Sequence, residues 1–334
     1  MFRIGGFVDH TVWLVEQPGG TFHRRKQLIP DLGVNEVLVK IAASGVNPLD
    51  TKIRVGQAAH ARQPLPAVLG LDMAGTVAAI GAHVTAFQVG AEVYGMVGGV
   101  GGLQGTLAQY IVVDADLLAH KPKNLSMLQA AALPLSIITA WEGLVDRAGV
   151  RAGQTVLIHA GAGGIGHIAI QIAMAFGAEV FATVSSEKKH IVEAIGAVAI
   201  DYRSTSVEDY VAASTEGQGF DIVYDTVGGA TLDASFASVK QYTGHVVSAL
   251  GWGSHSLAPL SFRGANYSGV FTLYPLISGQ GRAHHGEILA QTGELAEVGQ
   301  LKPFLNERHF TTADSEGAYA MVEKGALGKV VVEL

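Results

Sequence analysis

The amino-acid sequence predicts an α/β protein in which a doubly wound parallel-sheet domain accompanies a mostly β domain. Up to about residue 125, short alternating apolar runs lie between glycines and prolines, whereas residues 126–263 hold continuously apolar runs separated by helical patterns. Continuously apolar strands that alternate with helices are typical of a parallel sheet covered on both faces. Residues 264–334 end in a short strand that needs a sheet to join, so we assign them, with residues 1–125, to the first domain.

The individual strands are placed by their apolar runs. In the first domain we expect strands at Val37–Ile41, Gly75–Ile80, Glu92–Tyr94 and Leu107–Val113. In the second we expect them at Thr155–His159, Val180–Val184, Ala197–Ile200, Phe220–Asp225 and Gly244–Leu250. The C-terminal part predicts a helix near Glu287–Gly299 and a last strand at Gly328–Leu334.

Composition excludes several classes of function. The 334 residues include 43 glycines and no cysteine, which excludes disulfides, thiolate metal sites and a cysteine nucleophile. Lysine and arginine total 22 against 29 acidic residues, a net charge of −7, and no basic cluster is long enough to follow a phosphate backbone. Nucleic acid is therefore not an expected partner.

Apolar runs long enough for a membrane span are also missing from the sequence. The longest, residues 130–140, is about half of such a span and contains Pro134. The first residues show no basic segment followed by an apolar one, as a signal peptide would. We therefore expect a cytoplasmic protein with no membrane partner.

Gly161, Gly163 and Gly166 form a G-x-G-x-x-G pattern between an apolar strand and a helix. The first glycine permits a tight turn, the second lets a pyrophosphate approach the backbone, and the third lets the helix pack on the strand. The helix N-terminus adds N–H groups and a partial positive charge. The pattern predicts a dinucleotide site at Gly161, Gly163, Gly164, Ile165 and Gly166; the alternative is a tight turn without a ligand.

The end of the second strand in this domain favours NADP over NAD. An NAD site places an acidic residue there to hold the ribose 2′-hydroxyl. Here Ser185 and Lys188 follow the strand, and Tyr202 after the third strand can close over the same group. A hydroxyl and a positive charge suit a 2′-phosphate. The alternative interpretation is a solvated helix start, and Glu187 reduces the local positive charge.

Four segments together carry a family resemblance: Gly45–Gly56, Ala130–Leu144, the glycine turn, and Ser185–Lys189 with the following Tyr202-Arg203. They resemble the medium-chain dehydrogenase/reductase superfamily, and more closely its zinc-independent, ζ-crystallin-like quinone oxidoreductase branch. The resemblance implies a GroES-like catalytic domain at 1–125 and 264–334, with a Rossmann domain at 126–263 inserted in it. It also implies a homodimer formed through the sheet edges of the cofactor domains.

The zinc-bearing branch of this superfamily holds its metal with an early cysteine and a later Gly-His-Glu segment. The corresponding segments here are Gly45–Asn47 and Gly70–Gly75. A site built on Asp72 alone lacks the ligands that zinc favours, so we predict no metal. His284 and His285 are interpreted as exposed surface residues, because adjacent side chains diverge on a helix or strand.

Without a metal to polarise a carbonyl, an acceptor that already delocalises charge needs less help. The resemblance places Asn47 beside the nicotinamide as a hydrogen-bond donor to the substrate carbonyl, with Asp50 orienting the loop; alternatively, Asn47 only opens a turn. Many related enzymes carry a tyrosine near position 52, whereas this chain has Lys52, as do alkenal reductase-like members. Lys52 either stabilises an enolate or returns a proton to it, or is an exposed loop charge.

Three further residues are assigned to the cofactor. Thr139 is implied by the resemblance to hold the nicotinamide, the alternative being a buried helix threonine. Leu250 lies at the end of the fifth strand, where open α/β sheets present loops to a ligand. Lys329 precedes the terminal strand, and the resemblance implies that it approaches the cofactor. Gly98–Gly102 is either a mobile lip over the cleft or a linker.

These observations predict an NADPH-dependent reductase that acts on quinones or conjugated enones and enals without zinc. Two alternatives stay open. One is a neighbouring enzyme, either an enoyl thioester reductase or a metal-free alcohol dehydrogenase. The other is a non-catalytic NADPH-binding protein that keeps the fold without turnover.

Overall fold

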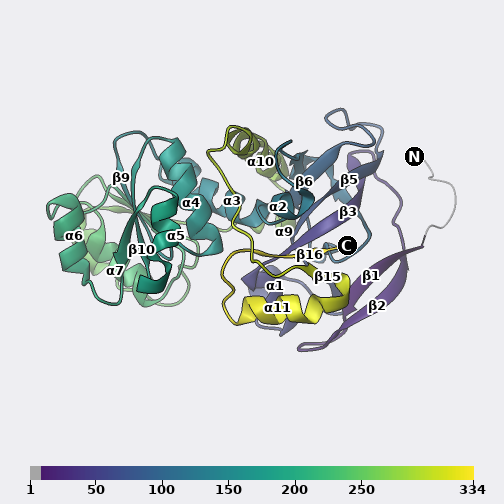
Figure 1. Ribbon diagram of the computed structural model, residues 1–334, viewed down its shortest axis with the longest axis horizontal. Helices are drawn as coiled ribbons and strands as arrows, with labels where there is room; N and C mark the ends of the chain where they lie inside the picture. Colours follow the sequence, from purple (N-terminus) through teal and green to yellow (C-terminus); the bar gives the residue numbers. More distant parts are fainter. Residues whose placement is uncertain (1–8) are drawn as a thin grey trace. The chain divides into compact units, whose positions relative to one another are not determined.

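The computed structural model describes residues 9–334 and divides the chain into two compact units, whose elements are labelled in Figure 1. One unit ends at Leu135 and resumes with Leu273–Leu334; the other is Ser136–Thr272. The expected boundaries at 126 and 264 lie 10 and 9 residues before those observed at 136 and 273. Each unit is described by itself.

The Ser136–Thr272 unit contains a parallel sheet of six strands. They are β9 (Thr155–Ile158), β10 (Glu179–Val184), β11 (Val198–Asp201), β12 (Ile222–Asp225), β13 (His245–Ser248) and β14 (Asn266–Gly269). Their spatial order is β11-β10-β9-β12-β13-β14, with every pairing parallel, which is the doubly wound order 3-2-1-4-5-6. The predicted Rossmann-type fold is therefore confirmed.

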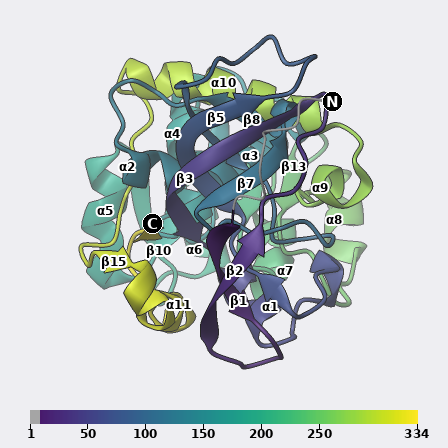
Figure 2. The same ribbon diagram turned by 90° about the vertical axis from the view of Figure 1, so that its right-hand side faces the viewer.

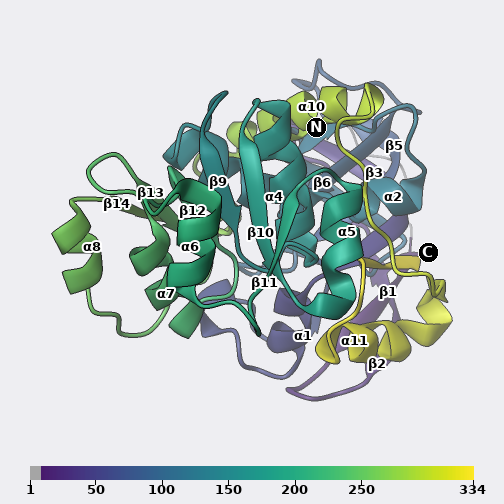
Figure 3. The same cartoon turned by 60° about the vertical axis from the view of Figure 1, so that its left-hand side comes forward.

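Helices connect these strands, as Figure 3 shows for the face turned forward there. They are α4 (Gly164–Ala175), α5 (Lys189–Ala194), α6 (Val207–Thr215), α7 (Ala230–Ser238) and α8 (Ala258–Arg263). Helix α3 (Pro134–Trp141) leads into the unit and continues as a π-helical segment, Glu142–Arg147.

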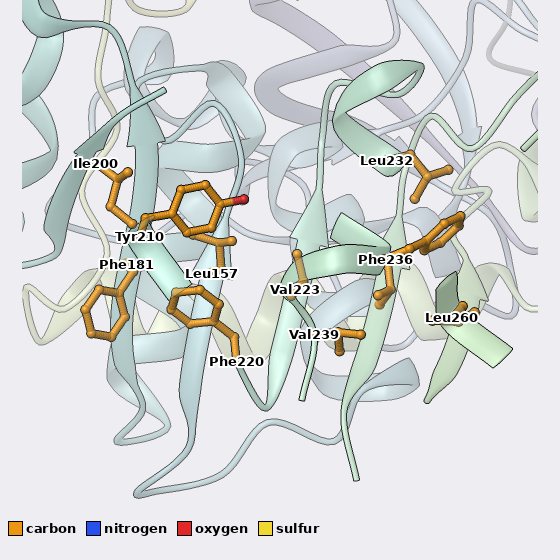
Figure 4. Packing of buried hydrophobic residues seen from close by; sticks show 11 residues of the cluster. Leu157, Phe181, Ile200, Tyr210, Phe220, Val223, Leu232, Phe236, Val239 and Leu260 are labelled. Carbon is orange, nitrogen blue, oxygen red and sulfur yellow. The ribbon is translucent and has the colours of Figure 1, made fainter. Parts of the chain in front are cut away.

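Strand alternation sends side chains to both faces of this sheet. On one face, Leu157 and Phe181 from the strands pack with Tyr210 of α6 and with residues of α7 and α8 in an apolar cluster (Figure 4). On the other face Ala182, the neighbour of Phe181, lies where side chains of α4 and α5 meet. Both faces are covered, which explains why the strands read as continuously apolar runs.

Strand β14 was not predicted. Its residues, Asn-Tyr-Ser-Gly, are mostly exposed because the strand lies at the sheet edge, so they carry no apolar pattern. The expected domain boundary at 264 leaves this strand outside the Rossmann domain, whereas the structure pairs it with β13.

The other unit is built on two sheets. Strands β2 (Phe22–Leu28), β1 (Asp9–Val15) and β4 (Ala67–Val68) form the first. The seven-stranded second sheet contains β15 (Phe310–Thr311), β16 (Val330–Glu333), β3 (Glu36–Val46), β5 (Asp72–Ile80), β6 (Glu92–Met96), β7 (Tyr110–Asp114) and β8 (Leu118–His120). Strand β3 pairs with β5, β7 and β16, and Figure 2 shows it between β5 and β7.

Five helices accompany these sheets within the described residues: α1 (Pro48–Arg54), α2 (Met127–Ala131), α9 (Tyr274–Ser278), α10 (Arg282–Glu297) and α11 (Ser315–Glu323). Short 3₁₀ turns lie at Ala59–Ala61, Ala115–Leu117, Ser186–Lys188 and Thr312–Asp314, the third of them in the Rossmann unit. The antiparallel pairing of β16 with β3 confirms that the tail returns to the first domain. No helix of residues 9–334 has the length and apolarity that crossing a bilayer requires.

Two expectations in this unit need correction. The strand predicted at Leu107–Val113 begins only at Tyr110, because the preceding residues pair with β1 instead, through Leu107 O and a bridge at Ala108. His285 is fully buried, whereas His284 is exposed. Adjacent helical residues point about 100° apart. Helix α10 packs on β8 and on the 115–117 turn, and it buries one histidine of the pair.

Candidate functional site

The glycine turn joins β9 to α4 as the sequence predicted. A Cβ on Gly161 would lie 2.6 Å from the Cβ of Ala182, and one on Gly166 would lie 2.3 Å from the carbonyl oxygen of Ala160. Both positions exclude a side chain, because strand and helix approach too closely there. Gly177 follows Phe176, the C-cap of α4, and has the left-handed φ of +80° that is common at this position.

Gly163 has a different environment. It is exposed, and a Cβ there would meet only Ala160, at 3.1 Å or more. Gly163 is the N-cap of α4, no side chain caps this end, and Gly164, Ile165 and Gly166 form the first helical turn. The first N–H groups of a helix have no partner within the helix. An open approach to these groups at the positive end of a 12-residue helix fits the pyrophosphate of a dinucleotide.

The residues assigned to the 2′ position of the ribose lie after β10 and β11. Ser185 follows β10 and is buried, and Lys188 ends the 3₁₀ turn. Tyr202 follows β11 and is 54% exposed, with the guanidinium carbon of Arg203 5.7 Å from its ring centroid. Strands β10 and β11 are paired, so the structure brings these residues to one edge of the unit.

Sequence reasoning missed an acidic residue at this edge. Asp201 pairs in register with Val184, the last residue of β10. Its carboxylate accepts hydrogen bonds from the Ser186 hydroxyl and from the Arg203 N–H, the latter at 3.0 Å, and these bonds lower the pKa of Asp201. The Arg203 guanidinium lies 3.2 Å from the Glu187 carboxylate. An NAD site carries its acidic residue at the end of the second strand, β10, whereas Asp201 ends the third strand, β11.

Asp225, the last residue of β12, was also missed. The Ser248 hydroxyl on the neighbouring strand donates to Asp225 at 2.7 Å, and the N–H groups of Val227 and Gly228 donate at 3.0 Å and 2.9 Å. The Leu250 N–H in turn donates to Ser248 Oγ at 3.1 Å. The buried carboxylate thus fixes both loops at the carboxyl ends of β12 and β13, including the one that carries Leu250.

Thr139 lies on α3 and is 5% exposed. Its carbonyl oxygen accepts a hydrogen bond of 2.6 Å from the Tyr224 hydroxyl of β12. Burial raises the pKa of Tyr224 well above its usual range, which keeps this hydroxyl protonated as a donor. The backbone at Thr139 is therefore fixed to the sheet that carries the glycine turn.

A polar cluster lies in the GroES-like unit, where β3, β5, α1 and the last strand meet. Asn47 is the N-cap of α1, and its N–H donates to Asp50 Oδ2 at 2.8 Å. The Asn47 side-chain amide donates from Nδ2 to Asp72 Oδ2 at 2.9 Å, and its Oδ1 accepts from Lys329 Nζ. The second oxygen of Asp72 accepts the Leu135 N–H at 3.0 Å. Segments more than 250 residues apart in the chain thus meet at Asn47 and Lys329.

Two carboxylates and one ammonium share this buried cluster. Asp50 and Asp72 are at most 1% exposed, and the Lys329 side chain is 12% exposed with its Nζ 4.0 Å from Asp72 Oδ2. Burial raises the pKa of Asp50 to about 7 and that of Asp72 to about 6, while the Lys329 charge opposes the shift in both. Burial lowers the pKa of Lys329, and the two carboxylates oppose that shift.

Lys52 lies on the exposed face of α1, not in a loop. Burial lowers the pKa of His60 in the following 3₁₀ turn, and the positive charge of Lys52 lowers it further. Next to this turn, an open cavity of about 370 Å³ is lined by Ile53 and mostly apolar residues between Gly56 and Pro64.

The Gly98–Gly102 segment is attached to that turn and is not free of contacts. The Gly101 N–H donates to the Ala61 carbonyl at 2.9 Å, and the Gly102 N–H donates to Gln63 Oε1 at 2.8 Å. Gln63 Nε2 donates back to the Leu103 carbonyl at 3.2 Å. These bonds fix one wall next to the cavity.

A zinc centre does not fit the residues at the two segments that the sequence pointed to. Asn47 and Asp72 are hydrogen-bonded to each other, and the neighbouring group is the cationic Lys329. Among residues 9–334, no three histidine, aspartate or glutamate side chains are grouped so that they could hold a metal ion.

The sheet order and the glycine turn are those of a dinucleotide-binding domain. Two family models match the chain: the alcohol dehydrogenase GroES-like domain over residues 33–123, and the zinc-binding dehydrogenase model over residues 164–278. The chain belongs to the medium-chain dehydrogenase/reductase superfamily, among relatives that are quinone and alkenal oxidoreductases.

Two curated relatives align with most of the chain. The 2-methylene-furan-3-one reductase of Solanum lycopersicum is 37% identical over 313 residues, which cover 91% of this chain and 73% of that protein. The chloroplastic NADPH-dependent alkenal/one oxidoreductase of Arabidopsis thaliana is 36% identical over 314 residues, covering 91% and 74%.

Solved structures agree with this placement. An alcohol dehydrogenase superfamily protein from Novosphingobium aromaticivorans matches with a TM-score of 0.95 and 54% identity, covering 97% of this chain and 99% of that one. The quinone oxidoreductase from Coxiella burnetii matches with a TM-score of 0.82 and 28% identity, covering 98% and 100%. The predicted family and the expected nicotinamide cofactor are thereby confirmed.

Proposed function

We propose that this protein is an NADPH-dependent reductase that transfers a hydride to quinones or to conjugated enones and enals without zinc. The observation that carries the proposal is the Asn47–Asp72–Lys329 cluster, which supplies polar groups but no zinc-binding set. The alkenal/one oxidoreductase and quinone oxidoreductase relatives support the same acceptor class.

In this proposal the chain's own residues bind and polarise the acceptor. The cofactor supplies the hydride when it is bound. The Asn47 amide donates a hydrogen bond to the acceptor carbonyl oxygen, where negative charge develops. Lys52 Nζ stabilises the resulting oxyanion or returns a proton to it. Asp50 accepts the Asn47 N–H and so orients the start of α1.

We propose NADPH over NADH because of the charges after β10 and β11. Lys188, Lys189 and Arg203 stand against Glu187 and Asp201, three positive charges minus two negative, a net of +1. Ser186 and a backbone N–H already bind the Asp201 carboxylate, which leaves it less available to a ribose hydroxyl. A 2′-phosphate gains from the lysines, whereas a 2′-hydroxyl does not.

A homodimer formed through the edge of the six-stranded sheet remains a proposal. Strand β14 is the edge strand, and large apolar side chains are exposed on and next to it: Tyr267 at 40%, Phe271 at 43% and Phe262 at 88%. Unpaired strand edges are templates for pairing with another chain. Light scattering coupled to size-exclusion chromatography should give twice the monomer mass, and a monomer at micromolar concentration would contradict the proposal.

The reductase activity is tested by the consumption of NADPH with a panel of a quinone, an enal and an enoyl thioester, with and without a metal chelator. We expect turnover with the quinone or the enal that the chelator does not change. Turnover only with the thioester would indicate an enoyl thioester reductase. Binding of NADPH with no turnover on the whole panel would indicate a non-catalytic protein. A loss of activity that zinc restores would refute the metal-free mechanism.

A further inference from the structure

The Asn47 side-chain amide is held at both ends inside the polar cluster. Its Nδ2 donates to Asp72 Oδ2 at 2.9 Å and its Oδ1 accepts from Lys329 Nζ. The main chain at Asn47 is also fixed, because its N–H donates to Asp50 at 2.8 Å. Asn47 is buried, and both its backbone N–H and its side-chain amide are hydrogen-bonded.

The two neighbours differ in what they can accept or donate. An ammonium group has only donors, and an ionised carboxylate has only acceptors. An asparagine amide rotated by half a turn would place its NH₂ against Lys329 and its oxygen against Asp72, so that donor faces donor and acceptor faces acceptor. Only one of the two amide orientations is compatible with this pair of neighbours.

In the favoured orientation, one of the two N–H groups of Asn47 Nδ2 is not used by Asp72 or Lys329. Nδ2 carries two hydrogens, and Asp72 accepts one of them. The second hydrogen is on the same nitrogen, Nδ2, whose position is fixed by its hydrogen bond to Asp72. In the opposite orientation the amide would present its oxygen there, which would repel a carbonyl oxygen.

We propose that Asp72 and Lys329 are positioning residues that lock the Asn47 amide so that its second N–H is available to the acceptor carbonyl. This inference rests on the proposed function, in which Asn47 is the donor. It assigns to Lys329 a task besides contact with the cofactor, and it gives a task to Asp72, which lies in the segment that corresponds to Gly-His-Glu of the zinc-bearing branch.

The cluster is built to keep this lock rigid. Asp72 is anchored on its other side by the Leu135 N–H at 3.0 Å, and its backbone carbonyl accepts the Thr106 hydroxyl at 3.1 Å. Asp72 and Asp50 both oppose the fall in the pKa of Lys329 that burial causes. The Lys329 charge in turn opposes the rise in the pKa of Asp72 that burial causes.

The test uses a double variant, Asp72→Asn with Lys329→Gln. Both replacements are amides that can donate or accept, and the pair has the same net charge as the original. The variant thus keeps hydrogen-bonding groups on both sides of Asn47 but removes the preference for one orientation. Lys329→Arg, which keeps a donor-only group, is the conservative rescue. Lys324→Met removes an exposed lysine in the same C-terminal segment and is the control.

We expect the double variant to lower kcat at least about tenfold, and Asn47→Ala about 100-fold, because loss of one such donor costs on the order of 10²–10³. KM for NADPH and its Kd from fluorescence titration should stay within about threefold. In the Asn47→Ala background, the same two substitutions should change kcat less than about twofold. A further fall in that background would show that Asp72 and Lys329 act independently of Asn47 and would overturn the inference.

A second measurement does not depend on turnover. Selective ¹⁵N labelling of asparagine, with Asn47→Ala for assignment, reports the Asn47 side-chain protons. We expect one proton shifted downfield by the carboxylate bond in the wild type and in Lys329→Arg, and a loss of that shift in the double variant. If the double variant fails to fold, Asp72→Asn with Lys329→Met, which also leaves no donor-only or acceptor-only group beside the Asn47 amide, is read by the same two measurements. An unchanged shift refutes the lock even if the protein reduces no acceptor, whereas a wild type without turnover refutes only the proposed function.

Discussion

The glycine turn yields a prediction that separates packing from cofactor binding. Gly166→Ala places a Cβ 2.3 Å from the Ala160 carbonyl oxygen and 3.0 Å from the Gly161 Cα. Ordinary C···O contacts begin at about 3.3 Å, so helix α4 and the turn must separate by about 1 Å. Overpacking costs about 1–3 kcal/mol, and the better helix propensity of alanine returns up to about 1 kcal/mol. We expect a net loss of about 1–2 kcal/mol.

Gly163→Ala is the matched control within the same turn. Gly163 has a φ of −81°, which any residue adopts, and the nearest contact of a Cβ there is 3.1 Å. We expect its unfolding free energy to stay within about 0.5 kcal/mol of wild type. Its Cβ would, however, project into the space from which a pyrophosphate reaches the helix N-terminus, so NADPH affinity should fall at least about tenfold.

Thermal unfolding and fluorescence titration with NADPH measure both effects. A loss of about 1–2 kcal/mol corresponds to a fall in Tm of roughly 3–8 °C for a domain of this size. Gly166→Ala should lower Tm by that amount, and Gly163→Ala should weaken binding with little change in Tm. If Gly166→Ala were as stable as wild type, the close-approach argument would be wrong; if Gly163→Ala bound NADPH normally, the cradle would lie elsewhere.

Three further predictions concern single side chains. Lys52→Met should lower kcat with an enal at least about tenfold while leaving the NADPH Kd within about twofold, and an unchanged kcat would remove Lys52 from the mechanism. Lys188→Glu should lower kcat/KM for NADPH about tenfold more than that for NADH in steady-state assays; equal losses would contradict the 2′-phosphate site. Burial raises the pKa of Asp50 from its ordinary value of 3.8 to about 7, so the folded protein binds more protons than the unfolded chain between these pH values. Stability should therefore fall as pH rises from about 4 to 7, and Asp50→Asn should flatten this slope in denaturant titrations, whereas the exposed control Asp31→Asn should not.

Much of the fold was predictable because the strongest sequence patterns lie in buried elements. Strands β9, β10, β12 and β13 are almost wholly buried, so each reads as an apolar run, and the glycine turn follows the first of them. Strand β14 escaped detection for the converse reason: an edge strand with exposed polar residues has no pattern. The partial strand at Leu107–Val113 was misplaced because its first residues are apolar but pair with another sheet.

The site was predictable where its residues are adjacent in sequence and not where they are brought together by the fold. Gly161, Gly163 and Gly166 are close in the chain, and their spacing alone indicates the turn. Asp225 and Ser248 are 23 residues apart and meet only because β12 and β13 are neighbours in the sheet. No local spacing rule contains that information.

Lys329 shows the same limit with a mechanistic consequence. The sequence places it before a terminal strand, and the family resemblance implies that it approaches the cofactor. What the sequence does not show is that the Lys329 ammonium meets Asn47, 282 residues earlier, because β16 pairs antiparallel with the end of β3, with Val330 opposite Val46. A lysine that follows a glycine at a strand start has no intrinsic preference for an asparagine; the sheet register creates the contact. The residues to compare among relatives without zinc are the three at this junction, since replacing both Asp72 and Lys329 with groups that donate and accept would release the Asn47 amide.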